Sequence, residues 1–227
     1  MEWEEEIDVG GFAIKPNVFS ADQLNHILDD ELQRSSMRSR AGIRHAMLLG
    51  SVRAIAQSHP LHQLACEVLG PCAFPFRATL FDKSPTSNWL IVWHQDTALP
   101  LRQRSELPGW GPWSTKEGIP YAHAPADVLS QILALRVHLD DSTKDNGPLR
   151  VLPGTHTLGL LNDDRIHELA AKIAPVDCLV GKGGVVAMRP LLVHASSKSR
   201  AEIPRRVMHI EYAACDSIAT PLELAIV

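Results

Sequence analysis

From residue 77 onwards the chain is a succession of short strand-like segments, and this pattern limits the possible folds more than any other feature. The segments are rich in Val, Ile, Leu and aromatic residues, and turn-forming residues separate them. Asn146-Gly147, a strong signal for a tight turn, lies between two of them. Several short strands of this kind predict a mainly β fold, either a barrel or a sandwich. The predicted strands cover residues 77–81, 89–96, 131–139, 149–152, 184–188 and 206–213.

The N-terminal third is predicted to be mainly helical. Ser20 and Gln23 have the spacing of a capping box, and apolar residues then recur at helical intervals as far as Leu32. Pro60 suits the first turn of a second helix, which Gly70-Pro71 ends. A third predicted helix lies among the strands. The predicted helices cover about residues 21–32, 60–69 and 163–172, and the Arg- and Ser-rich residues 34–44 are interpreted as a solvated connection.

Length and composition favour one folded domain. The chain has 227 residues, of which 45% are apolar and 21% charged, and these are ordinary values for a globular protein. We expect a single domain over residues 1–227, with a helical part to about residue 75 and a barrel from about 76 to 215. Helices would then flank the β structure.

Charge and targeting signals exclude several classes of protein. The formal net charge is -4, so no basic surplus favours nucleic acid or a membrane surface. The acidic N-terminus lacks the apolar core of a secretory signal, and no apolar stretch is long enough to span a bilayer. The four cysteines form no CxxC pair, which favours a reducing cytoplasm. Nothing in the sequence predicts the oligomeric state.

Residues 97–130 show little periodicity and contain five prolines and two tryptophans. A loop of this length inside a compact domain is usually functional or disordered, and the aromatic content argues against disorder. Trp113, together with Trp110 and Tyr121, is therefore a candidate for a lid that excludes water from a site. Packing in the core or on the surface is the alternative.

The segment that ends in Trp93-His94-Gln95-Asp96 contains candidate metal ligands. Because side chains alternate along a strand, His94 and Asp96 project to the same side, while Gln95 faces away and is free to orient the following loop. His194, which follows an apolar stretch, is the best candidate for a third ligand. Two imidazoles and one carboxylate form the facial triad of non-haem iron(II) oxygenases and leave open positions on the metal. An HxD pattern alone is weak, because such pairs also occur by chance.

Residues after His194 are suited to holding a dicarboxylate. A 2-oxo acid that chelates iron directs its second carboxylate away from the metal, and an arginine can bind that group with two hydrogen bonds. Arg205 and Arg206 are both candidates, and the Ser196 hydroxyl is a candidate donor. Surface exposure of both arginines is the alternative.

Four further residues are candidates for lining the site. Asn88 shares the strand face of His94 and is a candidate contact to the cosubstrate, and a polar residue at the strand edge is the alternative. Arg136 and His138 share one face of another strand and are candidates for the substrate pocket, together with Trp113. An inward Arg136 would favour a substrate with a carboxylate or phosphate group.

Three blocks resemble the phytanoyl-CoA dioxygenase family of iron(II)/2-oxoglutarate oxygenases. The first is Trp93-His94-Gln95-Asp96, similar to that family's WHQD. The second runs from Asn146 to His156, similar to its NGPLxVxPGSH segment with Thr in place of Ser. The third is His194 followed by Arg205 eleven residues later, a spacing that favours Arg205 over Arg206. Ser196 also matches a position that contacts the cosubstrate in relatives.

The resemblance implies a double-stranded β-helix, the jelly-roll barrel of cupin-like oxygenases, with helices packed outside. It also implies iron(II) as cofactor, 2-oxoglutarate and dioxygen as cosubstrates, and hydroxylation of a small molecule with release of succinate and carbon dioxide. Halogenating relatives lack the carboxylate ligand, so Asp96 favours hydroxylation. The resemblance does not identify the substrate.

Two other readings use the same residues. A zinc-dependent hydrolase also has three protein ligands and an open position. It is disfavoured because it gives Arg205 no task and offers no general base. A catalytically silent, cupin-like binding protein is the other alternative, since retained ligands do not guarantee turnover.

Overall fold

The computed structural model of the chain describes residues 3–28, 39, 42–85 and 87–227. Most of the predicted solvated connection at 34–44 lies outside the described residues, so that interpretation stays a prediction. Among the described residues, no helix combines the length and the apolar character needed to cross a membrane.

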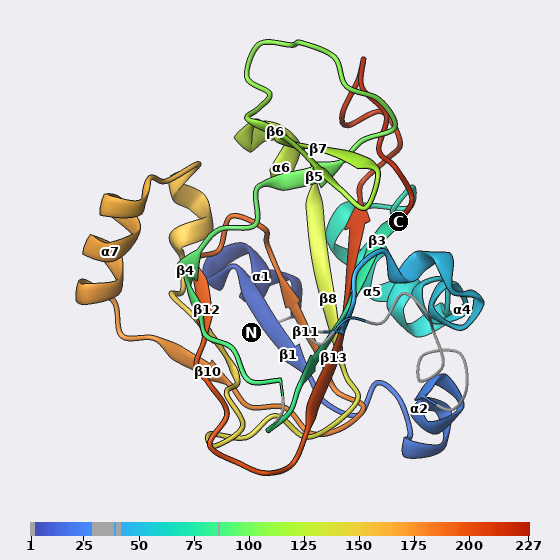
Figure 1. Cartoon of the computed structure of the whole chain (residues 1–227), viewed down its shortest axis with the longest axis vertical. Coiled ribbons are helices and arrows are strands. Elements are labelled where there is room, and N and C mark those ends of the chain that lie inside the picture. Colours follow the sequence, from blue (N-terminus) through green and yellow to red (C-terminus); the bar gives the residue numbers. More distant parts are fainter. Residues whose placement is uncertain (1–2, 29–38, 40–41, 86) are drawn as a thin grey trace.

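A large antiparallel sheet forms one wall of the barrel (Figure 1). Its long central strands carry the core on one face and the candidate pocket residues on the other, because side chains alternate along each strand. In spatial order the sheet contains β1 (Phe12–Lys15), β11 (Val185–Met188), β8 (Ile132–His138), β13 (Arg205–Ala213), β3 (Phe74–Lys83) and β2 (Gly42–Ile43).

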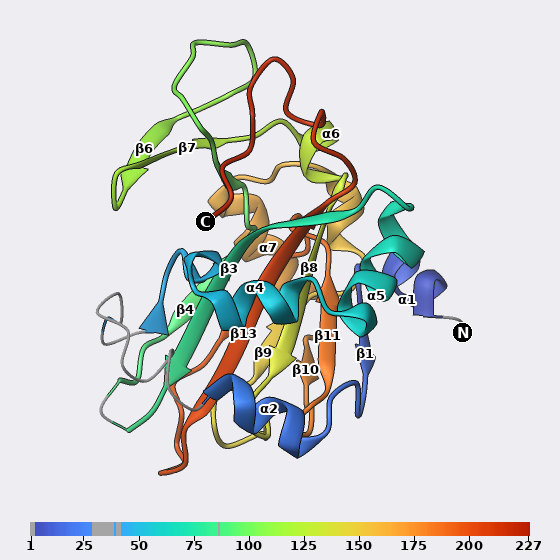
Figure 2. The ribbon, with the colours of Figure 1, turned by 90° about the vertical axis from the view of Figure 1, so that its right-hand side faces the viewer.

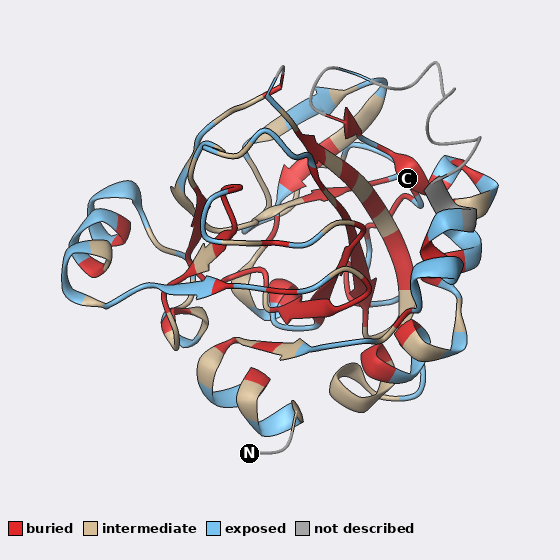
Figure 3. Cartoon of the chain, turned by 90° about the horizontal axis from the view of Figure 1, so that it is seen from below, coloured by how far each residue is buried: buried red, intermediate tan, exposed pale blue. Residues whose placement is uncertain are grey.

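A smaller antiparallel sheet forms the facing wall. It contains, in order, β10 (Val176–Cys178), β9 (Leu149–Val151), β12 (His194–Ser196) and β4 (Ile91–His94). Buried apolar residues of both sheets form one cluster, which includes Leu149 and Val151 from β9 and Val186 from β11. The two sheets therefore enclose a common interior, and Figure 3 shows buried residues concentrated on their strands.

Residues 97–130 contain regular structure, contrary to the expected long loop. Three short strands, β5 (Ala98–Pro100), β6 (Trp113–Lys116) and β7 (Ile119–His123), form an antiparallel sheet in the order β5-β7-β6. A short helix, α6 (Ala126–Leu129), follows them. Each strand is only three to five residues long, which is too short to show a readable period.

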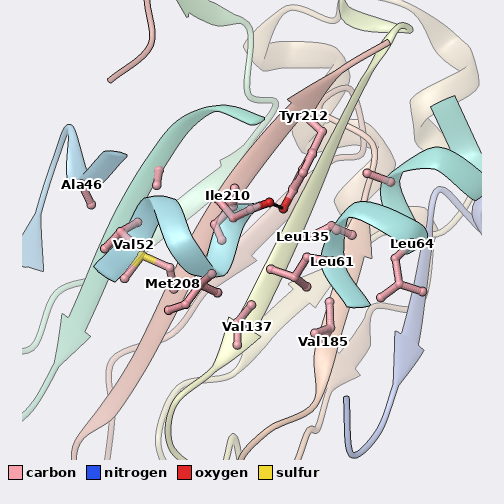
Figure 4. Close-up of a cluster of buried hydrophobic side chains, with 14 of the residues drawn as sticks. Ala46, Val52, Leu61, Leu64, Leu135, Val137, Val185, Met208, Ile210 and Tyr212 are labelled. Carbon is pink, nitrogen blue, oxygen red and sulfur yellow. Dashed lines mark hydrogen bonds between the residues drawn. The ribbon is translucent and has the colours of Figure 1, made fainter. Parts of the chain in front are cut away.

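Helices cover the outer face of the large sheet, where α4 and α5 lie across it (Figure 2). Their apolar residues pack onto the sheet: Val52 of α4 and Leu61 of α5 share a buried cluster with Leu135 of β8 and Tyr212 of β13 (Figure 4). The helical elements are α1 (Trp3–Gly10), α2 (Ala21–Leu28), η1 (Ala46–Leu48), α4 (Gly50–Ala56), α5 (His59–Leu69), η2 (Thr155–Leu158) and α7 (Asp163–Lys172).

The predicted helix starts agree with the structure. The Ser20 backbone N–H donates to Gln23 Oε1 (2.8 Å), and the Gln23 backbone N–H donates to Ser20 Oγ (3.3 Å), which is the reciprocal geometry of a capping box. The expectation of a mainly helical N-terminal part was incomplete. β1 and β2, whose short length conceals their alternation, form the two edges of the large sheet.

Replacing Tyr212 with Phe should destabilise the protein. The buried Tyr212 hydroxyl donates to the backbone carbonyl of Ala56 at the end of α4 (2.6 Å), so the variant leaves that carbonyl without its donor. An unmade buried hydrogen bond costs roughly 1–3 kcal/mol. Urea denaturation followed by circular dichroism measures the change, and an unchanged unfolding midpoint would show that α4 does not depend on this contact.

Candidate metal centre

Three side chains from two paired strands converge at one point between the sheets. β4 and β12 are antiparallel, and His94 lies directly opposite His194 in their register, so the two imidazole centroids are 4.2 Å apart. Asp96 follows β4 by two residues and projects to the same side as His94. One ligand atom from each of the three lies within 4.8 Å of the others. The structure therefore brings together all three predicted ligands.

Each imidazole has the orientation that metal binding requires. The Nδ1 atoms of His94 and His194 lie 2.8 Å and 2.9 Å from the backbone carbonyls of Val92 and Leu192. An Nδ1–H that donates to a carbonyl leaves the Nε2 lone pair available to a metal. These Nε2 atoms lie 3.6 Å and 3.4 Å from the two carboxylate oxygens of Asp96. Two nitrogens and one carboxylate, with no sulfur, suit iron(II).

Gln95 and backbone hydrogen bonds hold the acidic ligand in place. The Asp96 N–H donates to the Pro190 carbonyl (2.9 Å), which ties the end of β4 to the segment before β12. The Gln95 side chain donates to the carbonyls of Gly159 and Leu191 and accepts from the Leu161 N–H. This amide therefore links the end of β4 to the segment before α7 and to the segment before β12, whereas the loop after Asp96, which it was expected to orient, is not among these partners.

Electrostatics keep the carboxylate ionised and one imidazole neutral. Burial opposes ionisation of Asp96, but His194 and His94 hold the pKa of its carboxyl well below the usual value. Burial lowers the pKa of His194 to about 4, against the attraction of Asp96. An ionised carboxylate and a neutral imidazole are the forms that bind a cation.

A narrow inner pocket extends from the three ligands between the facing sheets. Its polar lining includes Ser196 of β12, Arg205 of β13 and Arg136 of β8. Arg205 Nε donates to the Asn146 carbonyl (3.1 Å) and Nη2 to Ser196 Oγ (3.4 Å), whereas the buried Nη1 has no partner among the described residues. Burial, with Arg136 nearby, lowers the pKa of Arg205 to about 10, so the group stays cationic at neutral pH.

Lys83, which the sequence analysis did not identify, lies beside the inner pocket. Its buried ammonium donates to Ser196 Oγ (2.9 Å) and to the Ser197 carbonyl (2.6 Å). Burial, Arg205 and Arg136 lower its pKa to about 8. Lys83 lies opposite Arg205 in the register of β3 and β13, two residues beyond the predicted end of the strand. Extending the strand alternation from Phe81 would have found it.

Two candidate residues lie elsewhere than the sequence suggested. The strand β4 begins only at Ile91, after Asn88, whose amide bridges the backbone N–H and carbonyl of Ser199 instead of lining the inner pocket. His138 shares a strand face with Arg136 but is fully buried and lines neither this pocket nor its neighbour. Burial, with Arg136 and Arg205 close by, lowers its pKa to about 3.

A wider outer pocket of about 350 Å³ adjoins the inner one, and Phe81 and Asp96 line both. Trp113 does not line it, contrary to expectation. Trp113 packs on a core cluster, whereas Ser114 and Lys116 face the outer pocket, because neighbouring residues of β6 point to opposite sides. The sequence drew attention to the aromatic side chain and missed the lysine three residues later.

Comparisons with known proteins give one family. The model of the phytanoyl-CoA dioxygenase (PhyH) family matches residues 15–207. A curated L-proline trans-4-hydroxylase from Streptomyces griseoviridis is 26% identical over 175 residues, which is 66% of this chain and 58% of that protein. The match thus spans less than two thirds of that relative.

Solved structures share the fold. AviO1 from Streptomyces viridochromogenes Tue57 superimposes with a TM-score of 0.66 at 23% identity, and 93% of each chain is covered. EctD from S. alaskensis, with 2-oxoglutarate and 5-hydroxyectoine, has a TM-score of 0.71 at 19% identity, covering 94% of this chain and 75% of that one. With the two facing antiparallel sheets, these likenesses confirm the predicted double-stranded β-helix.

Replacing Asp96 with Ala should weaken metal binding, because it removes the anionic member of the group. We expect an apparent iron(II) or cobalt(II) affinity lower by about tenfold or more, since even supporting contacts are worth that much. Metal titration of the apoprotein measures it without turnover. Asp127→Ala, the same change at an exposed position on α6, is the control. Equal affinity in both variants would remove Asp96 from the ligand set.

Proposed function

The chain belongs to the phytanoyl-CoA dioxygenase family of iron(II)- and 2-oxoglutarate-dependent oxygenases, and we propose that it hydroxylates a small-molecule substrate. In the proposed reaction, 2-oxoglutarate and dioxygen are consumed and succinate and carbon dioxide are released. One observation carries the proposal above all. The pocket that begins at the His94, Asp96 and His194 cluster also contains a buried guanidinium, Arg205, one nitrogen of which has no hydrogen-bond partner in the part of the chain that the structure describes.

His94, Asp96 and His194 are the proposed iron ligands. The short distances between their ligand atoms and the fixed orientation of both imidazoles support this role. Iron held there supplies dioxygen activation, which no protein side chain can provide. The retained carboxylate of Asp96 supports hydroxylation as the outcome, because halogenating relatives lack it. The chain's own contribution is to position the reactants and exclude water.

Arg205 and Ser196 are the proposed partners of the second carboxylate of 2-oxoglutarate, and Lys83 adds a third positive or polar contact. The Asn146 carbonyl already orients Arg205, whose Nη1 has no partner among the described residues, whereas the Ser196 hydroxyl donates to the Gly147 carbonyl and must leave it to bind the carboxylate. The positive charges of Lys83, Arg136 and Arg205 repel one another. Arg205 and Arg136 lower the pKa of Lys83, and Arg136 lowers the pKa of Arg205. A dianion in the inner pocket relieves this repulsion. We propose no contact from Asn88, whose amide is occupied.

The outer pocket is the proposed substrate site. It shares Asp96 and Phe81 with the inner pocket, whereas Arg205 and Ser196 line the inner pocket and not the outer one. Its volume of about 350 Å³ lies at the lower end of the range for small-molecule pockets. Arg136 lines the inner pocket and not this one, so we assign it to the cosubstrate side instead of to substrate recognition.

Turnover of 2-oxoglutarate tests the activity itself. We expect purified protein with iron(II), ascorbate and 2-oxoglutarate to consume dioxygen and form succinate, and removal of the metal with a chelator to abolish both. Zinc should not replace iron in this assay. Zinc-supported ester or amide hydrolysis without succinate would instead favour a hydrolase on the same ligands.

Replacing Arg205 with Ala should mainly raise the KM for 2-oxoglutarate. The loss of a charge-assisted hydrogen bond corresponds to about tenfold or more in affinity. Arg206→Ala is the matched control, because the Arg206 guanidinium is bound by Asp140 away from the pocket. Succinate formation at varied 2-oxoglutarate concentration separates the two. If Arg206→Ala raises the KM and Arg205→Ala does not, the assignment is wrong.

A further inference from the structure

The outer pocket has more positive charge than its own acidic groups can balance. Arg44, Arg77 and Lys116 line it, and Asp96 is the acidic residue that faces them. Arg77 is already neutralised, because it pairs with buried Glu211 and donates to the Ala98 carbonyl. Asp96 is the proposed metal ligand. Two cations therefore remain available to a ligand.

Of these two cations, Lys116 is the better candidate for binding an anionic ligand. It is half-buried on β6, with its ammonium 4.6 Å from the centre of the Tyr121 ring. Within the described parts of the chain it forms no ion pair with a carboxylate, and the face of an aromatic ring only partly offsets a charge. Burial, Arg77 and Arg44 lower the pKa of Lys116, and the carboxylates of Asp96 and Glu211 oppose this shift without cancelling it.

Arg44 completes the pair at the rim of the pocket. Its side chain is 48% exposed, and its Nε is 3.9 Å from Glu117, the limit for an ion pair. An exposed contact at this distance is weak and leaves most of the guanidinium donors to other partners. Although Arg44 and Lys116 are distant in the sequence, both line the outer pocket.

A buried contact holds these two residues together. His45, which follows Arg44, is buried, and its Nε2 lies 2.9 Å from the hydroxyl of buried Tyr121 on β7. His45 Nδ1 lies 3.4 Å from Glu117, in the turn between β6 and β7. The segment carrying Arg44 is thus fixed to the hairpin carrying Lys116. These contacts hold Arg44 and Lys116 in fixed segments on the same side of the pocket, so the two cations are not independent surface residues.

We infer that the substrate is a small molecule with an oxyanion group, a carboxylate or a phosphate, that Lys116 and Arg44 bind. This inference rests on the proposed function, because it places the opposite end of the substrate beside Asp96 for oxidation. Lys116 supplies a compact charge and Arg44 a planar fork, and both suit carboxylate and phosphate oxygens. A neutral or cationic substrate would leave the positive potential in place.

A binding experiment tests the inference without turnover. Benzoate and phenyl phosphate, with neutral benzamide as the comparison, are titrated calorimetrically into the full-length protein. We expect the two anions to bind, with one of them tighter, and benzamide to bind at least about tenfold more weakly. Lys116→Gln should weaken anion binding by a similar factor, and Lys116→Arg should retain most of it.

Two controls identify the pocket and the nature of the effect. Lys172→Gln makes the same charge change on α7, where the side chain is 66% exposed, and should leave anion binding unchanged. Excess 2-oxoglutarate, which fills the inner pocket around Arg205, should also leave it unchanged. Anion binding that 2-oxoglutarate abolishes and that does not depend on Lys116, or equal binding of benzamide, would overturn the inference.

A turnover screen then tests the substrate class. Small carboxylic acids, their primary amides and small phosphate esters are compared for stimulation of succinate formation. We expect acids or phosphates to stimulate, their amides to fail, and Lys116→Gln to raise the stimulating concentration without changing the KM for 2-oxoglutarate. Stimulation by the amides would refute the inference and leave the hydroxylase proposal intact. Absence of succinate with every compound would count against the proposed function, and the calorimetric result would still decide on the anion site.

Discussion

The antiparallel pairing of β4 with β12 is the constraint on which the rest of the site depends. It sets His94 opposite His194, and no other part of the chain has to move for the two imidazoles to face one ion. The pairing also fixes Asp96, whose backbone N–H is bound by the Pro190 carbonyl just ahead of β12. A shift of one residue in this register would turn one imidazole away from the other. The strands of the small sheet are only three or four residues long, yet the site depends on their register more than on that of the large sheet.

The barrel places two separate groups of positive charge around this centre. On one side buried Arg205 and Arg136 line the inner pocket, in which Asp96 is the acidic lining residue, and buried Lys83 lies behind Ser196 of the same pocket. On the other side the outer pocket contains Lys116 and Arg44. Charges in such settings are costly unless an ion of opposite sign arrives. The arrangement thus favours two anionic molecules, one in each pocket, on either side of a metal that would itself be partly neutralised by Asp96.

The sequence predicted those features that depend on local periodicity or on short motifs. The strands around Arg136 and Val207, the capping box at Ser20 and the helix over residues 163–172 agree with the structure because each is long or carries a capping signal. The double-stranded β-helix came from the family resemblance. The three-stranded sheet within residues 97–130 could not be predicted, since strands of three to five residues contain too few positions to show alternation. Lys83 was missed because the predicted strand ended two residues before it, and Lys116 because only the pairing of β6 with β7 brings it to the outer pocket.

Gly147 illustrates how one absent side chain serves two purposes. Its backbone has a φ of 67°, and a Cβ there would lie 2.3 Å from the Ser197 carbonyl and 3.2 Å from the Lys83 ammonium. The turn at Asn146-Gly147 therefore also supports the inner pocket, because the Gly147 carbonyl accepts a hydrogen bond from the Ser196 hydroxyl. A side chain at this position would disturb the turn and displace residues beside the inner pocket together, so the fold and the ligand affinity of that pocket depend on the same glycine.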